Sequence, residues 1–102
     1  MDQTAHEIRL KRLKFRAWHR GFVEADLILG PFVDRHGAEL TVAQVDDLEV
    51  LLEESDHDIY AWIIGRQPTP ERFDTEVMNL IKQFRFSAHT ARQEEAARLD
   101  KA

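Results

Sequence analysis

The residues of this sequence best suited to chemistry form a short charged cluster around position 21. Arg20 precedes a glycine, and two carboxylates follow at Glu24 and Asp26. Glycine is common just beyond the end of a helix, and carboxylates are favoured in a helix's first turn. The spacing therefore predicts a turn between two helices that holds a guanidinium and two carboxylates close together. Such a corner suits recognition of a partner, because its charged groups can form charge-assisted hydrogen bonds and Gly21 lets another backbone come close.

Patterns typical of catalysis or metal binding do not appear in the rest of the chain. The histidines are scattered without ligand spacing, cysteine is absent, and neither serine lies in a nucleophile motif. His19 and Glu24 could form an acid–base pair, but a histidine is also favoured at a helix C-terminus, and we prefer this second interpretation. We therefore expect no catalytic residue and no metal site.

Charge is unevenly distributed along the chain, whose net charge is −5. Positions 9–20 contain six basic residues and no acidic one, whereas positions 37–65 contain eight acidic residues and no Lys or Arg. The two runs are either solvated helix faces or the poles of a dipole that orients docking. Nucleic-acid binding by the basic run is a minor hypothesis, because the chain as a whole is acidic and would be repelled by phosphates.

Length and composition indicate one soluble domain. The 102 residues suffice for a single core, and 43% hydrophobic with 32% charged residues is typical of a globular protein. The longest apolar run, Ile59–Ile64, is far too short to span a membrane, and the N-terminus does not resemble a signal peptide. We therefore expect a cytoplasmic protein without a membrane partner.

Helical periodicity predicts an all-α, compact five-helix bundle over residues 1–86, followed by a solvated tail, flexible or helical, over 87–102. The five helices are expected over about Ala5–Trp18, from Val23 to before Gly37, from Thr41 as a capping box with Gln44, from an Asp56 cap to Gly65, and from Thr69-Pro70 onward. Gly30-Pro31 lies inside the second helix, which should kink or restart there. In the fourth helix we expect Trp62 in the core and Tyr60 pointing away from it.

The cluster Arg20-Gly21-x-x-Glu24-x-Asp26 resembles the signature of the flavinylation factors of succinate dehydrogenase, the SdhE family. Further similarity lies in Leu27–Phe32 of the second helix and in Asp56–Trp62 around the fourth. The resemblance covers about Arg9 to Phe84, and the five-helix layout agrees with that family's fold. His19 is a departure, because some bacterial members have a second arginine directly before the Arg-Gly pair.

The resemblance implies a non-enzymatic assembly factor. Such proteins bind the flavoprotein subunit of succinate dehydrogenase, and often that of fumarate reductase, and promote covalent attachment of FAD to a histidine of this client. FAD would then be the client's cofactor, and this chain would bind no cofactor stably. The partner-binding residues implied are Arg16, His19, Arg20, Gly21, Phe22, Glu24 and Asp26.

The absence of a transit peptide favours a bacterial member, and we expect a monomer. The alternative is a protein-binding module of another kind, such as the antitoxin of a toxin–antitoxin pair.

Overall fold

The computed structural model describes residues 2–87, which contain helices and turns but no strand. The elements are α1 (Asp2–Trp18), α2 (Val23–His36), the short 3-10 helix η1 (Gly37–Glu39), α3 (Val42–Leu51), α4 (Asp56–Ile64), the 3-10 helix η2 (Glu71–Phe73) and a helix over 76–87. The predicted all-α, five-helix fold is confirmed. All but the first residue of the predicted tail lie outside the described residues.

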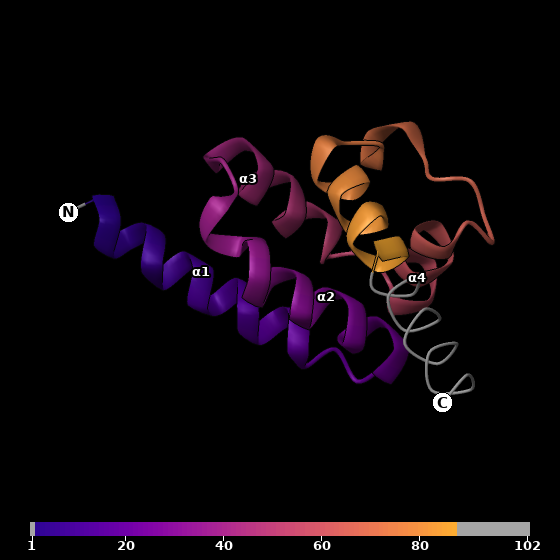
Figure 1. The fold of residues 1–102 in the computed structure, drawn as a ribbon, viewed down its shortest axis with the longest axis horizontal. Coiled ribbons are helices and arrows are strands. Elements are labelled where there is room, and N and C mark those ends of the chain that lie inside the picture. Colours follow the sequence, from indigo (N-terminus) through magenta and orange to yellow (C-terminus); the bar gives the residue numbers. More distant parts are fainter. Residues whose placement is uncertain (1, 88–102) are drawn as a thin grey trace, which may run out of the picture.

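Helices α1 and α2 form an antiparallel pair along one side of the molecule, with α3, α4 and the helix over 76–87 packed on the other side (Figure 1). A Cβ on Gly30 would overlap the indole ring of Trp18, so glycine at this position lets the two helices approach closely. The indole N–H also donates to Asp34 of α2 at 3.2 Å. Contrary to one expectation, α2 does not restart at Gly30-Pro31 but continues as one helix.

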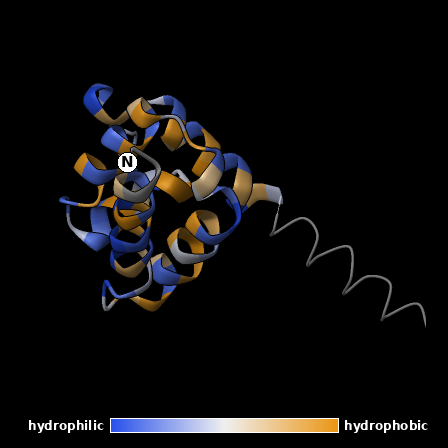
Figure 2. Ribbon diagram, turned by 90° about the vertical axis from the view of Figure 1, so that its left-hand side faces the viewer, coloured by the Kyte–Doolittle hydropathy of each residue, from blue (hydrophilic) through white to orange (hydrophobic). Residues whose placement is uncertain are grey.

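The core lies between the helices, where each contributes its apolar face while polar residues face outward (Figure 2). Among its most completely buried side chains are Leu13, Leu29, Phe32, Leu48, Ile59 and Ile81. No buried polar or charged residue occurs in the part of the chain whose burial is described. Trp62 is buried as predicted, and Tyr60 is only half-buried. Burial of apolar surface at this scale is the main stabilising term of such a bundle.

Local signals place most helix boundaries correctly. Thr41 and Gln44 form the predicted capping box at the start of α3. Gly65 ends α4 in the left-handed conformation, with φ +80°. The predicted Asp56 cap is off by one residue, because the Ser55 hydroxyl accepts the hydrogen bond from the Asp58 N–H and Asp56 is the first helical residue.

The last helix begins later than its sequence pattern predicts. Thr69-Pro70 introduces only the 3-10 turn η2, and the continuous helix covers 76–87. Its cap is Thr75, whose hydroxyl accepts a hydrogen bond from the Met78 N–H at 3.3 Å. Phe73, expected on the helical stripe, is instead delivered by the turn and stacks on Trp62 with ring centroids 5.2 Å apart. Stacking of two buried aromatic rings thus holds the loop before the helix in place.

Candidate partner-binding surface

The turn between α1 and α2 depends on a backbone conformation that favours glycine. α1 ends at Trp18, and Gly21 has φ +85°, the left-handed region that side chains rarely adopt. Phe22 is then extended, with φ −125° and ψ 102°, and α2 begins at Val23. No atom lies within 4 Å of a Cβ placed on Gly21. Glycine therefore permits this backbone conformation, and its lack of a side chain leaves open space outside the turn.

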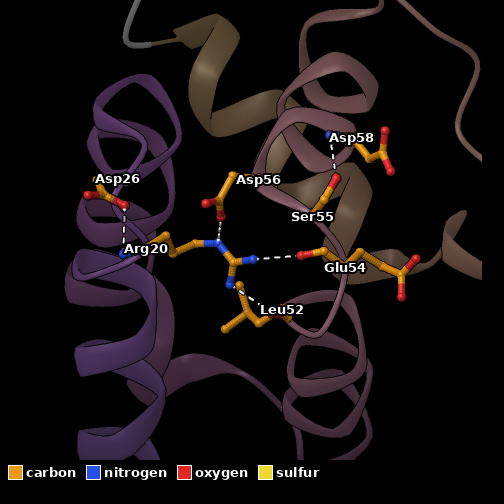
Figure 3. A network of polar contacts seen from close by, with 7 residues as sticks. All are labelled: Arg20, Asp26, Leu52, Glu54, Ser55, Asp56 and Asp58. Atoms are coloured by element: carbon orange, nitrogen blue, oxygen red, sulfur yellow. Dashed lines mark hydrogen bonds and ion pairs between the residues drawn. The ribbon is translucent and has the colours of Figure 1, made fainter.

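The Arg20 guanidinium points into the protein, toward the link between α3 and α4 (Figure 3). Its Nε donates to the Asp56 carboxylate, with which it forms an ion pair. Its Nη1 donates to the Leu52 carbonyl at 2.8 Å, and its Nη2 to the Glu54 carbonyl at 2.7 Å. The side chain is only 10% exposed. The predicted corner, in which this guanidinium stands beside the carboxylates of Glu24 and Asp26, is wrong in this respect.

The position of Arg20 is explained by the groups that it meets. Leu52 and Glu54 follow the last turn of α3, where backbone carbonyls lack helical partners and a positive charge is favoured. Asp56 occupies the first position of α4, where a negative charge is favoured. Arg20 therefore donates hydrogen bonds to carbonyls at the end of α3 and pairs with the carboxylate at the start of α4. Its contacts are charge-assisted hydrogen bonds, the stronger class in proteins.

Asp26 holds the other side of the same turn. Its carboxylate accepts a hydrogen bond from the backbone N–H of Arg20 at 3.1 Å. Arg20 is thus bound through its side chain to the α3–α4 link and through its main chain to the first turn of α2. The carboxylate–arginine contact inferred from the sequence exists, but it involves the arginine backbone.

Glu24 differs from Asp26 in facing solvent. It is exposed, and within the described residues it has no ion pair or side-chain hydrogen bond. Two exposed apolar side chains lie near it on α2, Val23 at 66% exposure and Leu27 at 56%. A free carboxylate among exposed apolar side chains, next to an open glycine turn, is a surface suited to binding another protein. Val23 and Leu27 were not predicted as site residues. Both are apolar residues outside the buried stripe of α2, and this pattern could have identified them.

The remaining predicted site residues flank this surface. Arg16 donates to Glu53 at 2.9 Å, and His19 stacks on Phe15 with ring centroids 4.1 Å apart. His19 Nδ1 lies 2.8 Å from the Phe15 carbonyl, consistent with a residue that closes the end of α1. No hydrogen bond or ion pair joins His19 to Glu24 among the described residues.

Phe22 packs against two aromatic residues of α4. Its ring centroid lies 4.6 Å from that of His57 and 5.5 Å from that of Tyr60. These contacts join the turn to α4 beside the Arg20–Asp56 ion pair. The sequence of Asp56–Trp62 resembles the family, yet the place of this segment beside the turn depends on tertiary packing.

The basic and acidic runs of the sequence partly pair with one another. Two arginines of α1 and one in the turn after it pair with acidic side chains of α3, of the α3–α4 link and of the start of α4. The pairs are Arg9 with Asp46 and Glu49, Arg16 with Glu53, and Arg20 with Asp56. The pKa of Arg9 is raised, most by its side-chain hydrogen bond to Asp46 and next by that to Glu49. The charge runs are therefore neither two separate poles nor wholly solvated faces.

No group of three or more His, Asp or Glu side chains among the described residues is placed to hold a metal ion. No helix in residues 2–87 is both long and apolar enough to cross a membrane.

Comparison with known proteins identifies the family to which the chain belongs. The family model described as "Flavinator of succinate dehydrogenase" matches residues 11–85. The FAD assembly factor SdhE of Acetobacter pasteurianus is 40% identical over 70 residues, which cover 69% of this chain and 64% of that protein. Succinate dehydrogenase assembly factor 2 of Dictyostelium discoideum, a mitochondrial protein, is 39% identical over 72 residues, covering 71% of this chain and 51% of its own length.

A third relative, mitochondrial succinate dehydrogenase assembly factor 2-B of Drosophila simulans, is 38% identical over 79 residues, which cover 76% of this chain and 51% of that protein. The chain thus spans about half to two thirds of the length of these relatives. The matched residues, 11–85, include the α1–α2 turn, the α3–α4 link and most of the last described helix. The chain belongs to the family of succinate dehydrogenase flavinators.

Proposed function

We propose that this chain is a non-catalytic assembly factor that binds the flavoprotein subunit of succinate dehydrogenase and promotes covalent attachment of FAD to it. The flavoprotein subunit of fumarate reductase is a second candidate client. Membership of the flavinator family supports this proposal, and so do the names of its relatives. The observation that carries it is the exposed surface of Gly21, Val23, Glu24 and Leu27 on a turn fixed from inside by Arg20 and Asp26.

This surface is better suited to holding a client than to reacting with it. Glu24 offers acceptor oxygens to N–H donors of the client, and the open space over Gly21 admits the client's backbone close to the turn. The exposed apolar side chains of Val23 and Leu27 lose contact with water on binding, which favours association. FAD is the client's cofactor in this account, and the chain contributes contacts only.

A binding protein can accelerate a client's own reaction by changing its conformational equilibrium. If the client attaches its flavin only when the flavin and the acceptor histidine are aligned, a helper that binds this aligned state better increases its population. The rate gain then equals the population gain, since the aligned groups react without further help. A bundle with a fixed turn suits this task because its binding surface needs little ordering on association.

The test is co-expression of the client flavoprotein subunit with and without this chain, with covalent flavin read by in-gel fluorescence. We expect a clear increase in covalent flavin with the wild-type chain and none with Glu24→Ala. No increase with the wild-type chain, and no complex on gel filtration, would refute the proposal. Co-purification with a different protein, such as a toxin, would then identify the alternative class.

A further inference from the structure

We propose that Arg20 is a positioning residue of the partner-binding surface: it acts on the client through Asp56 and the carbonyls of Leu52 and Glu54, without contacting the client itself. The inference rests on the proposed function for its client. Its structural basis is the set of contacts that direct the guanidinium toward Asp56 and the carbonyls of Leu52 and Glu54 (Figure 3).

The burial of Arg20 leaves little of it for a partner. Each of its three side-chain nitrogens donates to an oxygen of the chain itself, and only 10% of the side chain is exposed. Breaking these contacts to reach a client would leave the Asp56 carboxylate without its cation and two carbonyls without a donor. That cost is large for partly buried charged groups. Arg20 is therefore expected to keep the same contacts when the client is bound.

The same contacts fix the residues that do face outward. Arg20 directly precedes Gly21, which has more conformational freedom than any other residue type. The side chain of Arg20 attaches this point to the α3–α4 link, and its N–H attaches it to Asp26 in α2. With both attachments the path of the chain from Gly21 to Glu24 is restricted before binding. Loss of the side-chain attachment would add conformational freedom that the client must remove, and affinity would fall.

This mechanism makes a prediction that direct contact does not. Asp56 lies on α4 and is 23% exposed, yet it should influence client binding as strongly as Arg20 does. If Arg20 acts through Asp56, then Arg20→Lys and Asp56→Asn damage one and the same interaction, and their effects on affinity do not add. If Arg20 instead binds the client directly, the two substitutions act independently and their effects multiply in the dissociation constant.

The experiment is a double-mutant cycle on the full chain, with the dissociation constant for the purified flavoprotein subunit measured for wild type, Arg20→Lys, Asp56→Asn and the double variant. We expect each single variant to bind about tenfold more weakly, the scale of one charge-assisted hydrogen bond, and the double variant to bind within about twofold of the weaker single one. Glu49→Gln, which breaks an ion pair of Arg9 instead, is the matched control and should bind like wild type. Multiplying effects, or normal binding by Asp56→Asn, would overturn the proposal.

Amide hydrogen exchange of the free chain gives a second readout that does not depend on the client. Arg20→Lys and Asp56→Asn should speed exchange of the Arg20 and Asp26 amides, which donate to the Asp26 carboxylate and the Phe22 carbonyl, at least about fivefold while the core amides of α3 stay protected, because only the attachment of the turn is loosened. Unchanged exchange in the turn would contradict the positioning role. If the wild-type chain fails to bind the flavoprotein, the proposed function fails, and the exchange result alone decides whether Arg20 fixes the turn.

Discussion

Gly21, between α1 and α2, and Gly65, after α4, adopt nearly the same backbone conformation, with φ of +85° and +80°. No atom lies within 4 Å of a Cβ placed on either of them. Gly65 ends α4, and its own N–H and that of Arg66 return to carbonyls of the same helix. Exposed polar residues, Arg66 and Gln67, follow it. The Gly65 turn is therefore complete as a helix ending and needs no further role.

The Gly21 turn is surrounded by quite different residues. An arginine with only 10% of its side chain exposed precedes it, an aromatic residue packed on α4 follows it, and the exposed Val23 and Glu24 open the next helix. Contacts from 32 to 36 residues away hold its arginine in place. A left-handed glycine therefore does not mark a binding surface by itself; the anchored interior and the exposed exterior around it do.

Replacing each of the two glycines by arginine should give the largest difference in client binding between the two turns. Gly21→Arg and Gly65→Arg both force a side chain into the left-handed region, at a cost of roughly 1–2 kcal/mol in the free energy of unfolding, without a clash. Only Gly21→Arg places a long side chain over the proposed surface, so it alone should abolish complex formation with the flavoprotein on gel filtration. Equal loss of binding in both variants would show that lowered stability, not the surface, is responsible.

Removing the charge of Glu24 should have the next largest effect. Glu24→Gln keeps the shape of the side chain but loses charge-assisted hydrogen bonds worth about 1.5–3 kcal/mol, so the client's dissociation constant should rise roughly ten- to a hundredfold. Urea denaturation should give a free energy of unfolding only about 0.3–1 kcal/mol lower, because Glu24 is exposed and its charge is favoured in the first turn of α2. Asp47→Asn, at an exposed position on α3, is the matched control, and equal weakening by it would point to a general charge effect.

Truncating an exposed apolar residue near Glu24 should weaken binding moderately. Leu27 on α2 and Val50 on α3 are similarly exposed, at 56% and 58%. Leu27→Ala should raise the dissociation constant about three- to tenfold through lost apolar contact, whereas Val50→Ala should leave it unchanged. Titration calorimetry of both variants measures the difference. A larger effect at Val50 would place the interface on α3.

The smallest effect is expected at the middle of α1. Arg9→Gln removes the exposed ion pairs with Asp46 and Glu49, so the thermal midpoint should fall slightly at low salt and match wild type in about 1 M salt. Client binding should stay normal, because Arg9 lies at the middle of α1 and the proposed surface lies beyond the end of that helix. A binding defect in this variant would extend the interface along the helix.

Features set by neighbours in the sequence could be predicted from it. The turn at Gly21, the capping box of Thr41 and Gln44, and the left-handed end of α4 all follow from residues within one helical turn. The direction of the Arg20 side chain could not be predicted this way, because Asp56 is 36 residues away and competes with the nearer Glu24 and Asp26 as a partner.

The predicted start of the last helix was wrong for a related reason. Thr69-Pro70 and Thr75 are both valid local start signals. The choice between them is made by Phe73, which stacks on the distant Trp62 and holds the preceding segment in a 3-10 turn. Tertiary contacts thus explain both wrong predictions, the direction of the Arg20 side chain and the start of the last helix.

The most direct test of the account is the amount of covalent flavin on the client, measured by in-gel fluorescence after co-expression with no partner, the wild-type chain, Gly21→Arg or Gly65→Arg. We predict strong fluorescence with the wild-type chain and with Gly65→Arg, and fluorescence at the no-partner level with Gly21→Arg. Equal fluorescence with Gly21→Arg and Gly65→Arg, at either level, would contradict the claim that the surface at the α1–α2 turn promotes flavinylation.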